Sequence, residues 1–277
     1  MRNSLKRFKI ANLLFIFILI GLIGIFSLGF IKSIHKTSAI NVASKELSIV
    51  LGDGITMEFV CIDSGSFLMG SYEEEGDSDE TPRHKVTITK PFYIGKYEVT
   101  QEQWEKVMGN NPSELKGEKN PVDTVSWNDC IEFTEELKTI TGREFTLPTE
   151  AQWEYACRAG TTTKWFFGDD ENNADLYGWI DSNSQKTTHP VGMLQPNAWG
   201  LYDMYGNLSE WCKDWYQNSY LETEAVDPAG PEVGDSHVVR GGGWGEFPDN
   251  ARSSYRNANG ENGENNGTGF RCVMYLE

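Results

Sequence analysis

The sequence predicts an α+β domain with a low content of regular secondary structure, preceded by one N-terminal transmembrane helix. Three observations lead to this prediction: short alternating apolar stretches occur early in the chain, a few capped amphipathic helices follow, and the second half has no long periodic segment. The chain has 277 residues, of which 28 are Gly, and glycine favours tight turns and positive φ angles. A hydrophobic fraction of 39% is large enough for a core, so the chain as a whole is not disordered.

The N-terminus is typical of a membrane segment. Four basic side chains within residues 2–9 precede Leu13–Ile31, an uncharged run of apolar and small residues. At about 1.5 Å per residue, a helix of this length comes close to the roughly 30 Å hydrocarbon core of a bilayer. We expect residues 1–32 to form an uncleaved signal anchor with its basic end in the cytoplasm, and cleavage near Ala39 or Ala43 is the alternative.

The rest of the chain is expected to form one domain on the extracytoplasmic side of the cell membrane, either periplasmic or extracellular. Residues 33–48 are mixed polar and basic, which predicts a linker. Residues 49–277 contain no Pro/Gly-rich break and no internal repeat, which indicates a single domain. The net charge of −17 repels nucleic-acid phosphates, so we expect no nucleic-acid partner.

The first elements of this domain are expected to be strands. Residues 57–71 and 84–100 alternate apolar and polar side chains and are rich in Val, Ile, Thr, Phe and Tyr. Between them, the acidic residues 72–83 predict a loop. A capping box at Thr100 then predicts a short helix that runs to Met108.

Two further helices have clear boundaries in the sequence. Ser126 and Asp129 form a capping box, and the helix that they open ends at Gly142. Its apolar side chains recur at helical spacing, which indicates one buried face. Thr149 caps the helix that follows it, and beyond Gly160 we expect only short strands and loops.

Three motifs stand in an order that resembles a known family. They are LPTEAQWEYACRAG (147–160), NAWGLYDMYGNLSEW (197–211) and the interval that RGGGW opens and GFRC closes (240–272). In this order they resemble the formylglycine-generating enzyme, or sulfatase-modifying factor, family from about residue 50 to the last residues. The resemblance implies the loop-rich fold of that family, which is related to C-type lectin-like domains.

Members of this family with oxidase activity bind copper through a pair of cysteines, which the resemblance places in the interval 240–272. Counting from RGGGW, the first position falls on Glu246 and the second on Asn250 or Ala251. None of these residues offers the soft thiolate that holds Cu(I). We therefore expect no copper and no catalytic residue. An oxidase that converts a cysteine of a client sulfatase to formylglycine is the alternative hypothesis.

The segment DMYGNLSEW (203–211) carries two acids close to several backbone carbonyls. By its spacing alone, this segment is a polar turn with solvated acids. The resemblance implies a structural Ca²⁺ ion there, with ligands at Asp203, Gly206, Leu208 and Glu210. Such an ion would stabilise a region that has little helix or sheet.

The sequence contains five cysteines, which in an oxidising compartment allow at most two disulfides. Their spacing does not reveal the pairing. In the resembled family, the positions that match Cys157 and Cys272 belong to disulfides, although the usual partners are not at the matching places here. The candidate pairings are Cys157–Cys272 and Cys130–Cys272.

The interval between the RGG and GFR motifs mixes rigid aromatics with short polar side chains, as antibody paratopes do. We therefore expect residues 244–268 to form a protein- or glycan-binding surface. The candidate contact residues are Trp244, Glu246, Phe247, Asp249, Asn250, Arg252, Ser254, Tyr255, Asn257, Asn259, Asn262 and Asn265. Lectin-like domains of the resembled family that are diversified by retroelements carry their variable residues between matching flanks. The alternatives are an ordinary Asn/Gly-rich loop and a purely structural envelope module.

Four arginines punctuate the same interval of an otherwise acidic chain: Arg240, Arg252, Arg256 and Arg271. A guanidinium group can bind a ligand carboxylate or phosphate through two parallel hydrogen bonds. It can equally pair with Asp or Glu in a protein interior. The second role is the one that the resemblance implies and the one we expect.

Overall fold

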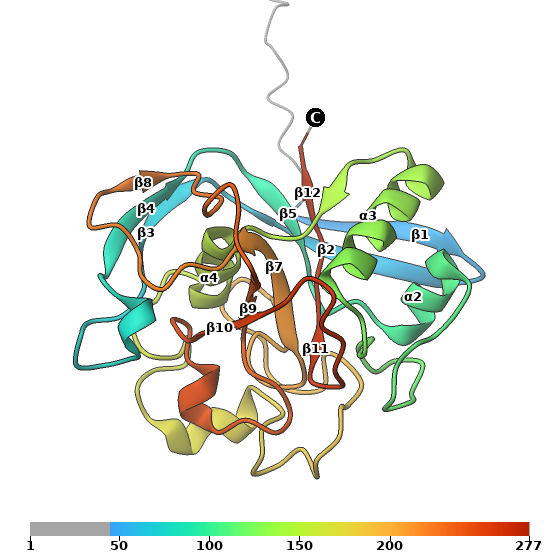
Figure 1. The fold of residues 1–277 in the computed structure, drawn as a ribbon. Helices are drawn as coiled ribbons and strands as arrows, with labels where there is room; N and C mark the ends of the chain where they lie inside the picture. The colour runs from blue at the N-terminus through green and yellow to red at the C-terminus, as the bar shows by residue number, and fades with distance from the viewer. Residues whose placement is uncertain (1–44, 277) are drawn as a thin grey trace, which may run out of the picture. The chain divides into compact units, whose positions relative to one another are not determined.

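The computed structural model describes residues 45–276. Within that range the chain forms three β-sheets, three α-helices and three short 3₁₀ turns, which long loops connect (Figure 1). This arrangement confirms the prediction of a mixed fold with little regular structure. The expected signal anchor and most of the linker lie outside the described residues. No helix within residues 45–276 is long and apolar enough to cross a membrane.

The largest sheet has five strands in the order β1-β2-β5-β12-β6, and all neighbours are antiparallel. The strands are β1 (Glu46–Gly52), β2 (Ile55–Ile62), β5 (Phe92–Gly95), β12 (Val273–Tyr275) and β6 (Phe145–Thr146). Because β12 comes from the C-terminus and lies between β5 and β6, the last residues of the chain complete a sheet that its first third begins.

A four-stranded sheet carries the third of the sequence motifs. Its order is β10-β9-β7-β11, with β10 (Arg256–Asn259), β9 (His237–Arg240), β7 (Ser209–Trp215) and β11 (Thr268–Gly269). β9 and β11 flank β7 on opposite sides. Arg240 at the end of β9 and Gly269 of β11 are both in register with Glu210 of β7. This sheet therefore holds both ends of the interval 241–268.

The third sheet has three strands in the order β3-β4-β8. They are β3 (Gly65–Met69), β4 (His84–Ile88) and β8 (Ala225–Val226). The acidic residues between β3 and β4 form the predicted loop, which contains the 3₁₀ turn η1 (Ser78–Glu80).

The two predicted strand regions are confirmed, but each is divided into two strands. Residues 57–71 contain most of β2 and all of β3, and residues 84–100 contain β4 and β5. β4 and β5 belong to different sheets, and the chain passes from one to the other at Pro91. Proline lacks the backbone N–H of a ladder, so it favours this break.

The helices begin at the predicted capping boxes. α2 (Gln101–Met108), α3 (Trp127–Thr141) and α4 (Glu150–Arg158) follow Thr100, Ser126 and Thr149, whose hydroxyl groups accept hydrogen bonds from backbone N–H groups of the first turn. α2 and α3 end at glycines in the left-handed conformation. The remaining 3₁₀ turns are η2 (Glu171–Leu176) and η3 (Pro248–Ala251).

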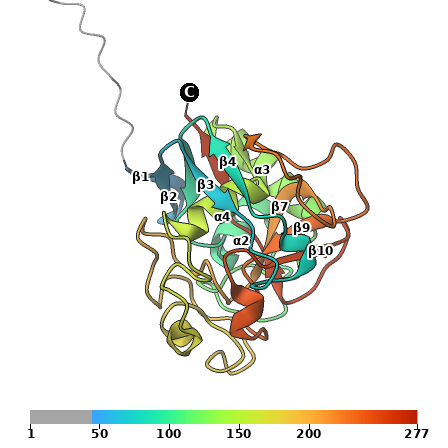
Figure 2. The ribbon, with the colours of Figure 1, turned by 90° about the vertical axis from the view of Figure 1, so that its left-hand side faces the viewer.

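The core consists of two clusters of buried side chains, one around α4 and one around α3. α4 contacts β3 and β7 (Figure 2), and each residue of this helix is buried. In the other cluster, Phe133 stacks on Trp104 at 5.3 Å between ring centroids and meets Phe270 edge-on. The first sequence motif, residues 147–160, therefore contributes a helix to the buried core of the domain.

All five cysteines are free thiols in the structure, so neither candidate disulfide is present in it. Cys157 belongs to the cluster around α4, whereas Cys130 and Cys272 belong to the cluster around α3. Burial raises the pKa of the Cys157 thiol to about 12 and raises that of Cys130 well above its usual value. These thiols are therefore protonated and pack as small apolar side chains.

Candidate functional site

Glycines shape the turn that follows β9. Gly241 and Gly242 have φ angles of 93° and 68°, in the left-handed region that glycine tolerates best. A Cβ atom on Gly242 would lie 2.6 Å from the carbonyl oxygen of Asn250. The backbone can therefore fold this tightly onto η3 only with glycine at that position.

Trp244 fixes the next part of the segment. Its backbone N–H donates to the carbonyl of Asn207, and its indole Nε1–H donates to the carbonyl of Asn266, both at 2.9 Å. Its own carbonyl accepts from the Ser184 hydroxyl at 2.7 Å. Trp244 is thereby held by three segments that are distant in the sequence, and its indole is fixed by the bond to Asn266.

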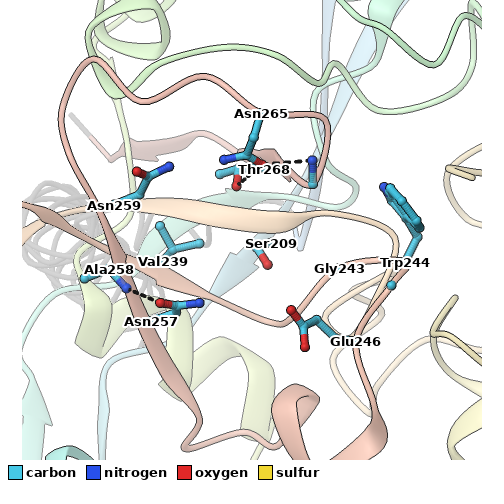
Figure 3. Close-up of a pocket in the computed structure, with 12 residues that line it drawn as sticks. Ser209, Val239, Gly243, Trp244, Glu246, Asn257, Ala258, Asn259, Asn265 and Thr268 are labelled. Atoms are coloured by element: carbon cyan, nitrogen blue, oxygen red, sulfur yellow. Dashed lines mark hydrogen bonds between the residues drawn. The ribbon is translucent and has the colours of Figure 1, made fainter. Parts of the chain in front are cut away.

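A cavity of about 320 Å³ lies between this segment, β10 and β11 (Figure 3). Asn257 and Asn259 come from β10 on one side, and Trp244 and Glu246 come from the segment after β9 on the other side (Figure 3). The lining residues are Ser209, Val239, Gly243, Trp244, Gly245, Glu246, Asn257, Ala258, Asn259, Asn265, Gly267 and Thr268. Five of the twelve predicted contact residues therefore line one cavity.

The polar side chains of the cavity are only partly hydrogen-bonded. The Asn257 carbonyl oxygen accepts from the N–H of Ala258 at 2.8 Å. The Asn265 carbonyl oxygen accepts from Gly267 N–H at 2.9 Å and from the Thr268 hydroxyl at 3.0 Å. Within the described residues, the two amide NH₂ groups donate to no partner. They are available to a ligand.

Within the described residues, only one of the two Glu246 carboxylate oxygens accepts a hydrogen bond. Its Oε2 accepts from the side-chain amide of Asn250 at 2.7 Å, whereas its Oε1 has no partner in the part of the chain that the structure describes. The same is true of the Ser209 hydroxyl and of the Asn259 side chain. The cavity thus offers both donors and acceptors.

Other predicted contact residues lie outside the cavity. Phe247 is 65% exposed, Asp249 is exposed and Tyr255 is half-buried. Asn262 is exposed and bonds to Asn128 at 3.0 Å. These residues belong to the surface around the site or to neighbouring loops rather than to its lining.

Two predicted contact residues are buried, which corrects the expectation of one continuous surface. Arg252 is 5% exposed and Ser254 is 4% exposed. Arg252 binds both oxygens of Glu80, at 2.7 and 2.8 Å. The backbone therefore passes through the interior after η3 and returns to the surface at Asn257.

The arginines of the interval pair with buried acids, as expected. Arg256 binds both oxygens of Glu150, at 2.6 and 2.8 Å. Arg240 bonds to Glu150 at 3.2 Å and to Glu154 at 2.6 Å. Despite its complete burial, Glu150 has a lowered pKa, because Arg256 and Arg240 outweigh the desolvation.

Arg271 forms the remaining pair of this network. It binds both oxygens of Glu210, through Nε at 2.7 Å and Nη2 at 2.6 Å. The indole of Trp153 donates to the same carboxylate at 2.8 Å. Glu210, a candidate calcium ligand, is therefore already fully engaged.

Asp203 fits a cation better. Its Oδ2 accepts from Gly192 N–H at 2.7 Å, whereas its Oδ1 is buried and has no partner among residues 45–276. Burial raises the pKa of Asp203 to about 6. Burial, together with Asp203 and Glu210, also raises the pKa of nearby Glu98 well above its usual value. Three acids, Glu98, Asp203 and Glu210, therefore lie near the single guanidinium of Arg271.

The expected ligands of this cation fit only in part. Asp203 supplies an unpaired oxygen, and the carbonyls of Gly206 and Leu208 belong to the same turn, but Glu210 is bound to Arg271. Glu98 shapes this turn, because its oxygens accept from Leu208 N–H and from the Asn207 amide. Across the described range, no three His, Cys, Asp or Glu side chains are grouped around one metal position.

The positions to which the family resemblance assigns the copper cysteines have other roles here. Glu246 lines the cavity, Asn250 holds its carboxylate, and Ala251 is buried. Sequence reasoning missed Ser209, Val239 and Thr268 as lining residues. They reach the cavity through the pairing of β7 with β9 and β11, and the parallel pair of two residues in β11 leaves no pattern in the sequence.

Comparison with known proteins agrees with these observations. Residues 53–276 match the model of the sulfatase-modifying factor enzyme 1-like domain. The chain is 32% identical over 269 residues to the chaperone protein LppX of Paenibacillus barcinonensis, a match that covers 79% of this chain and 90% of that protein. It is also 32% identical over 200 residues to the formylglycine-generating enzyme of Streptomyces coelicolor, covering 66% of this chain and 60% of the enzyme.

Among solved structures, Treponema denticola variable protein 1 superposes with a TM-score of 0.79 at 28% sequence identity. The superposition covers 84% of this chain and all of that protein. The similarity therefore extends over the whole described domain, including the segment that lines the cavity.

Proposed function

We propose that this chain, which belongs to the sulfatase-modifying factor enzyme 1-like family, is a binding module without oxidase activity. It recognises a protein or a glycan through the cavity between β9, β10 and β11. The observation that carries this proposal is the hydrogen bond of 2.7 Å between Glu246 and Asn250 in the segment that lines the cavity. The family resemblance assigns the first copper cysteine to Glu246 and the second to Asn250 or Ala251, and none of these side chains is a thiolate that could hold Cu(I).

The chemistry of the lining supports binding. Asparagine amides and hydroxyls adapt their hydrogen bonds to different partners, and a fixed tryptophan adds a rigid apolar contact at low entropic cost. The names of two relatives point the same way: one is a chaperone protein and one is a variable protein. Both names suit proteins that act by contact with partners.

Gly245 provides a sharp test of the cavity. A Cβ atom there would meet nothing within 4 Å, and its φ is not in the left-handed region, so Gly245→Trp adds bulk at the lining without strain. Gly260→Trp is the matched control, because Gly260 has equal space, is exposed and lies outside the lining. The full chain in detergent, and both variants, would be screened against a random peptide display library and a glycan array.

We expect ligands that bind the wild type and Gly260→Trp but not Gly245→Trp. Ligands that bind all three proteins equally would place recognition elsewhere on the domain. If no peptide or glycan binds the folded wild type, the binding proposal fails and the structural envelope module takes its place.

A second candidate, the oxidase, is favoured by the similarity to the Streptomyces coelicolor formylglycine-generating enzyme. It would require metal ligands other than the two missing cysteines. The chain would be incubated with a cysteine-containing sulfatase peptide, oxygen and either Cu(I) or Fe(II), and the peptide mass would be measured. We expect no formylglycine, and conversion that a chelator abolishes would overturn the binding proposal.

Two further features complete the proposal. A structural Ca²⁺ ion binds at the turn 203–210, where the unpaired Oδ1 of Asp203 supports a cation site. The apolar run Leu13–Ile31 tethers the domain to the cell membrane on the extracytoplasmic side. Extraction of the full chain from membranes by detergent, but not by alkaline carbonate, would support the tether.

A further inference from the structure

The charge and hydrogen-bonding capacity of the cavity define its ligand more closely. We propose that the cavity binds a primary ammonium group, the side chain of a lysine on a protein partner. This inference rests on the proposed binding function. It names the group that the cavity recognises.

The first argument is the charge of the lining. Of the residues that line the cavity, Glu246 alone is charged, and no Lys, Arg or His is among them. Its Oε1 has no partner within residues 45–276, and its carboxylate points into the cavity (Figure 3). The Glu246 carboxylate would repel a negatively charged ligand in the cavity.

The second argument is that the nearby cations are not available. From Gly241 to Phe270 the sequence contains two cationic side chains, Arg252 and Arg256. Both are buried, and each binds both oxygens of a carboxylate, Glu80 or Glu150. No arginine of this segment can therefore neutralise Glu246.

The charged side chains of the same segment that are not buried are all acidic. Asp249 and Glu264 are exposed, and Glu246 and Glu261 are partly exposed. With a net charge of −17 on the chain, the field around the cavity attracts cations and accelerates their association. In the cavity, the negative charge of Glu246 lies beside hydrogen-bonding groups that have no partner within residues 45–276.

The third argument distinguishes an ammonium from a guanidinium. Arginine binds a carboxylate best through two parallel hydrogen bonds to both oxygens. Oε2 of Glu246 is already taken by Asn250, so one oxygen is left. An ammonium group is a point charge with three donors, and it needs single acceptors around it. The Ser209 hydroxyl, which lies next to Glu246 in the cavity (Figure 3), can supply a second acceptor.

The remaining lining suits the rest of a lysine residue. The side chains of Val239 and Trp244 offer apolar surface for the four-carbon stem. The free NH₂ groups of Asn257 and Asn265 can donate to carbonyls of the partner's backbone.

The test uses Gly-Gly-Lys-Gly-Gly peptides that are acetylated at the N-terminus and immobilised through the C-terminus, with the full chain in detergent, measured by surface plasmon resonance. Counterpart peptides carry arginine, norleucine, Nε-acetyl-lysine or glutamate in the central position. We expect the lysine peptide to bind at least about tenfold more tightly than each counterpart, because only it places an ammonium at Glu246. The binding should weaken as the salt concentration rises.

Glu246→Gln is the decisive variant. It keeps the shape and the hydrogen bond with Asn250 but removes the charge, so we expect the preference for lysine to fall to about twofold or less. Glu264→Gln is the matched control, because it removes a charge from the same segment outside the lining. It should leave the preference unchanged.

The outcomes separate this inference from the proposed function. Tighter binding of a neutral, acidic or arginine peptide, or a lysine preference that Glu246→Gln does not reduce, would overturn the ammonium assignment. If the screen yields ligands that Gly245→Trp blocks but that contain no lysine, binding by the cavity stands and this inference falls. If no ligand is found at all, both fall.

Discussion

Two sets of side chains in the interval 240–272 are used in opposite ways. Its four arginines are buried and pair with Glu80, Glu150, Glu154 and Glu210 at distances between 2.6 and 3.2 Å. Its asparagines around the cavity are at least partly exposed, and they leave donors and acceptors unused. The segment therefore contains a rigid half and an adaptable half within one stretch of about thirty residues.

The difference shows how a loop-rich domain can hold a binding site. Buried ion pairs with complete hydrogen bonding fix the course of the backbone where helix and sheet are scarce. Side chains that are not needed for that purpose are then free to meet a ligand. Stability and recognition should accordingly respond to different substitutions, which the following measurements test in order of expected effect.

The largest effect is expected from Glu150→Gln in the arginine network. Glu150 holds Arg256, Arg240 and the hydroxyl of Tyr220, so its loss leaves two guanidinium groups without full compensation. We expect the free energy of unfolding to fall by about 3–5 kcal/mol. Urea unfolding followed by tryptophan fluorescence measures it, with exposed Glu264→Gln as the control. A loss below about 1 kcal/mol would contradict the rigid role of the network.

The next effect is a gain of stability at the edge of the network. Asp214 accepts the backbone N–H of Glu150 at 3.0 Å, and burial, followed by the charge of Glu150, raises its pKa from 3.8 to about 7. The folded protein therefore keeps a proton that the unfolded chain releases above pH 3.8. This contribution to stability is complete below pH 3.8 and is lost as the pH rises through about 7.

Asp214→Asn should remove that loss, since asparagine also accepts from Glu150 N–H. We expect the variant to be about 2–4 kcal/mol more stable than the wild type at pH 8, with a difference that shrinks toward pH 4. Urea unfolding at several pH values tests it. Parallel pH dependences of the two proteins would show that Asp214 does not titrate as described.

A smaller effect is expected where the network meets the candidate cation site. Calcium at about a hundred times its dissociation constant should raise the free energy of unfolding by about 2.7 kcal/mol. Asp203→Asn should remove most of this gain, because it takes away the charge of the unpaired oxygen. Thermal unfolding with calcium, magnesium or chelator measures it, and exposed Asp249→Asn is the control. Equal stabilisation of both variants would place the ion elsewhere.

The smallest effect on stability is expected in the cavity. Asn257→Ala removes a side chain that is exposed and whose NH₂ group has no partner within residues 45–276. We expect the free energy of unfolding to change by about 0.5 kcal/mol or less. Binding of any ligand found in the screen should nevertheless weaken severalfold. A large loss of stability would mean that the adaptable half is also part of the frame.

The sequence predicted the helices well, because their boundaries depend on local signals. Capping boxes at Thr100, Ser126 and Thr149 need only neighbouring residues. The pairing of the four arginines with acids was implied by the family resemblance, and it agrees with the need to pair buried charges. The assignment of the copper-cysteine positions to Glu246 and to Asn250 or Ala251 came from the family resemblance.

The lining of the cavity was predicted only in part, because it depends on strand pairing between distant segments. Ser209 and Thr268 meet through a parallel pair of two residues, too short to leave a periodic pattern. The burial of Arg252 and Ser254 follows from contact with the acidic loop at Glu80, more than 150 residues earlier in the chain. Calcium, the tether and the ligand are predictions that await measurement.

The register of the four-stranded sheet has a consequence for how this domain could change. Because Arg240 and Gly269 both align with Glu210, the chain leaves and re-enters the frame at one fixed point. The loop 260–267 joins β10 at one edge of the sheet to β11 at the other, so it crosses above the strands between them. Doubling the length of such a loop costs only about 0.6 kcal/mol in closure entropy. The loop can therefore be lengthened at little entropic cost, provided that the backbone carbonyls of Glu261, Asn265 and Gly267 keep their hydrogen bonds to the rest of the domain.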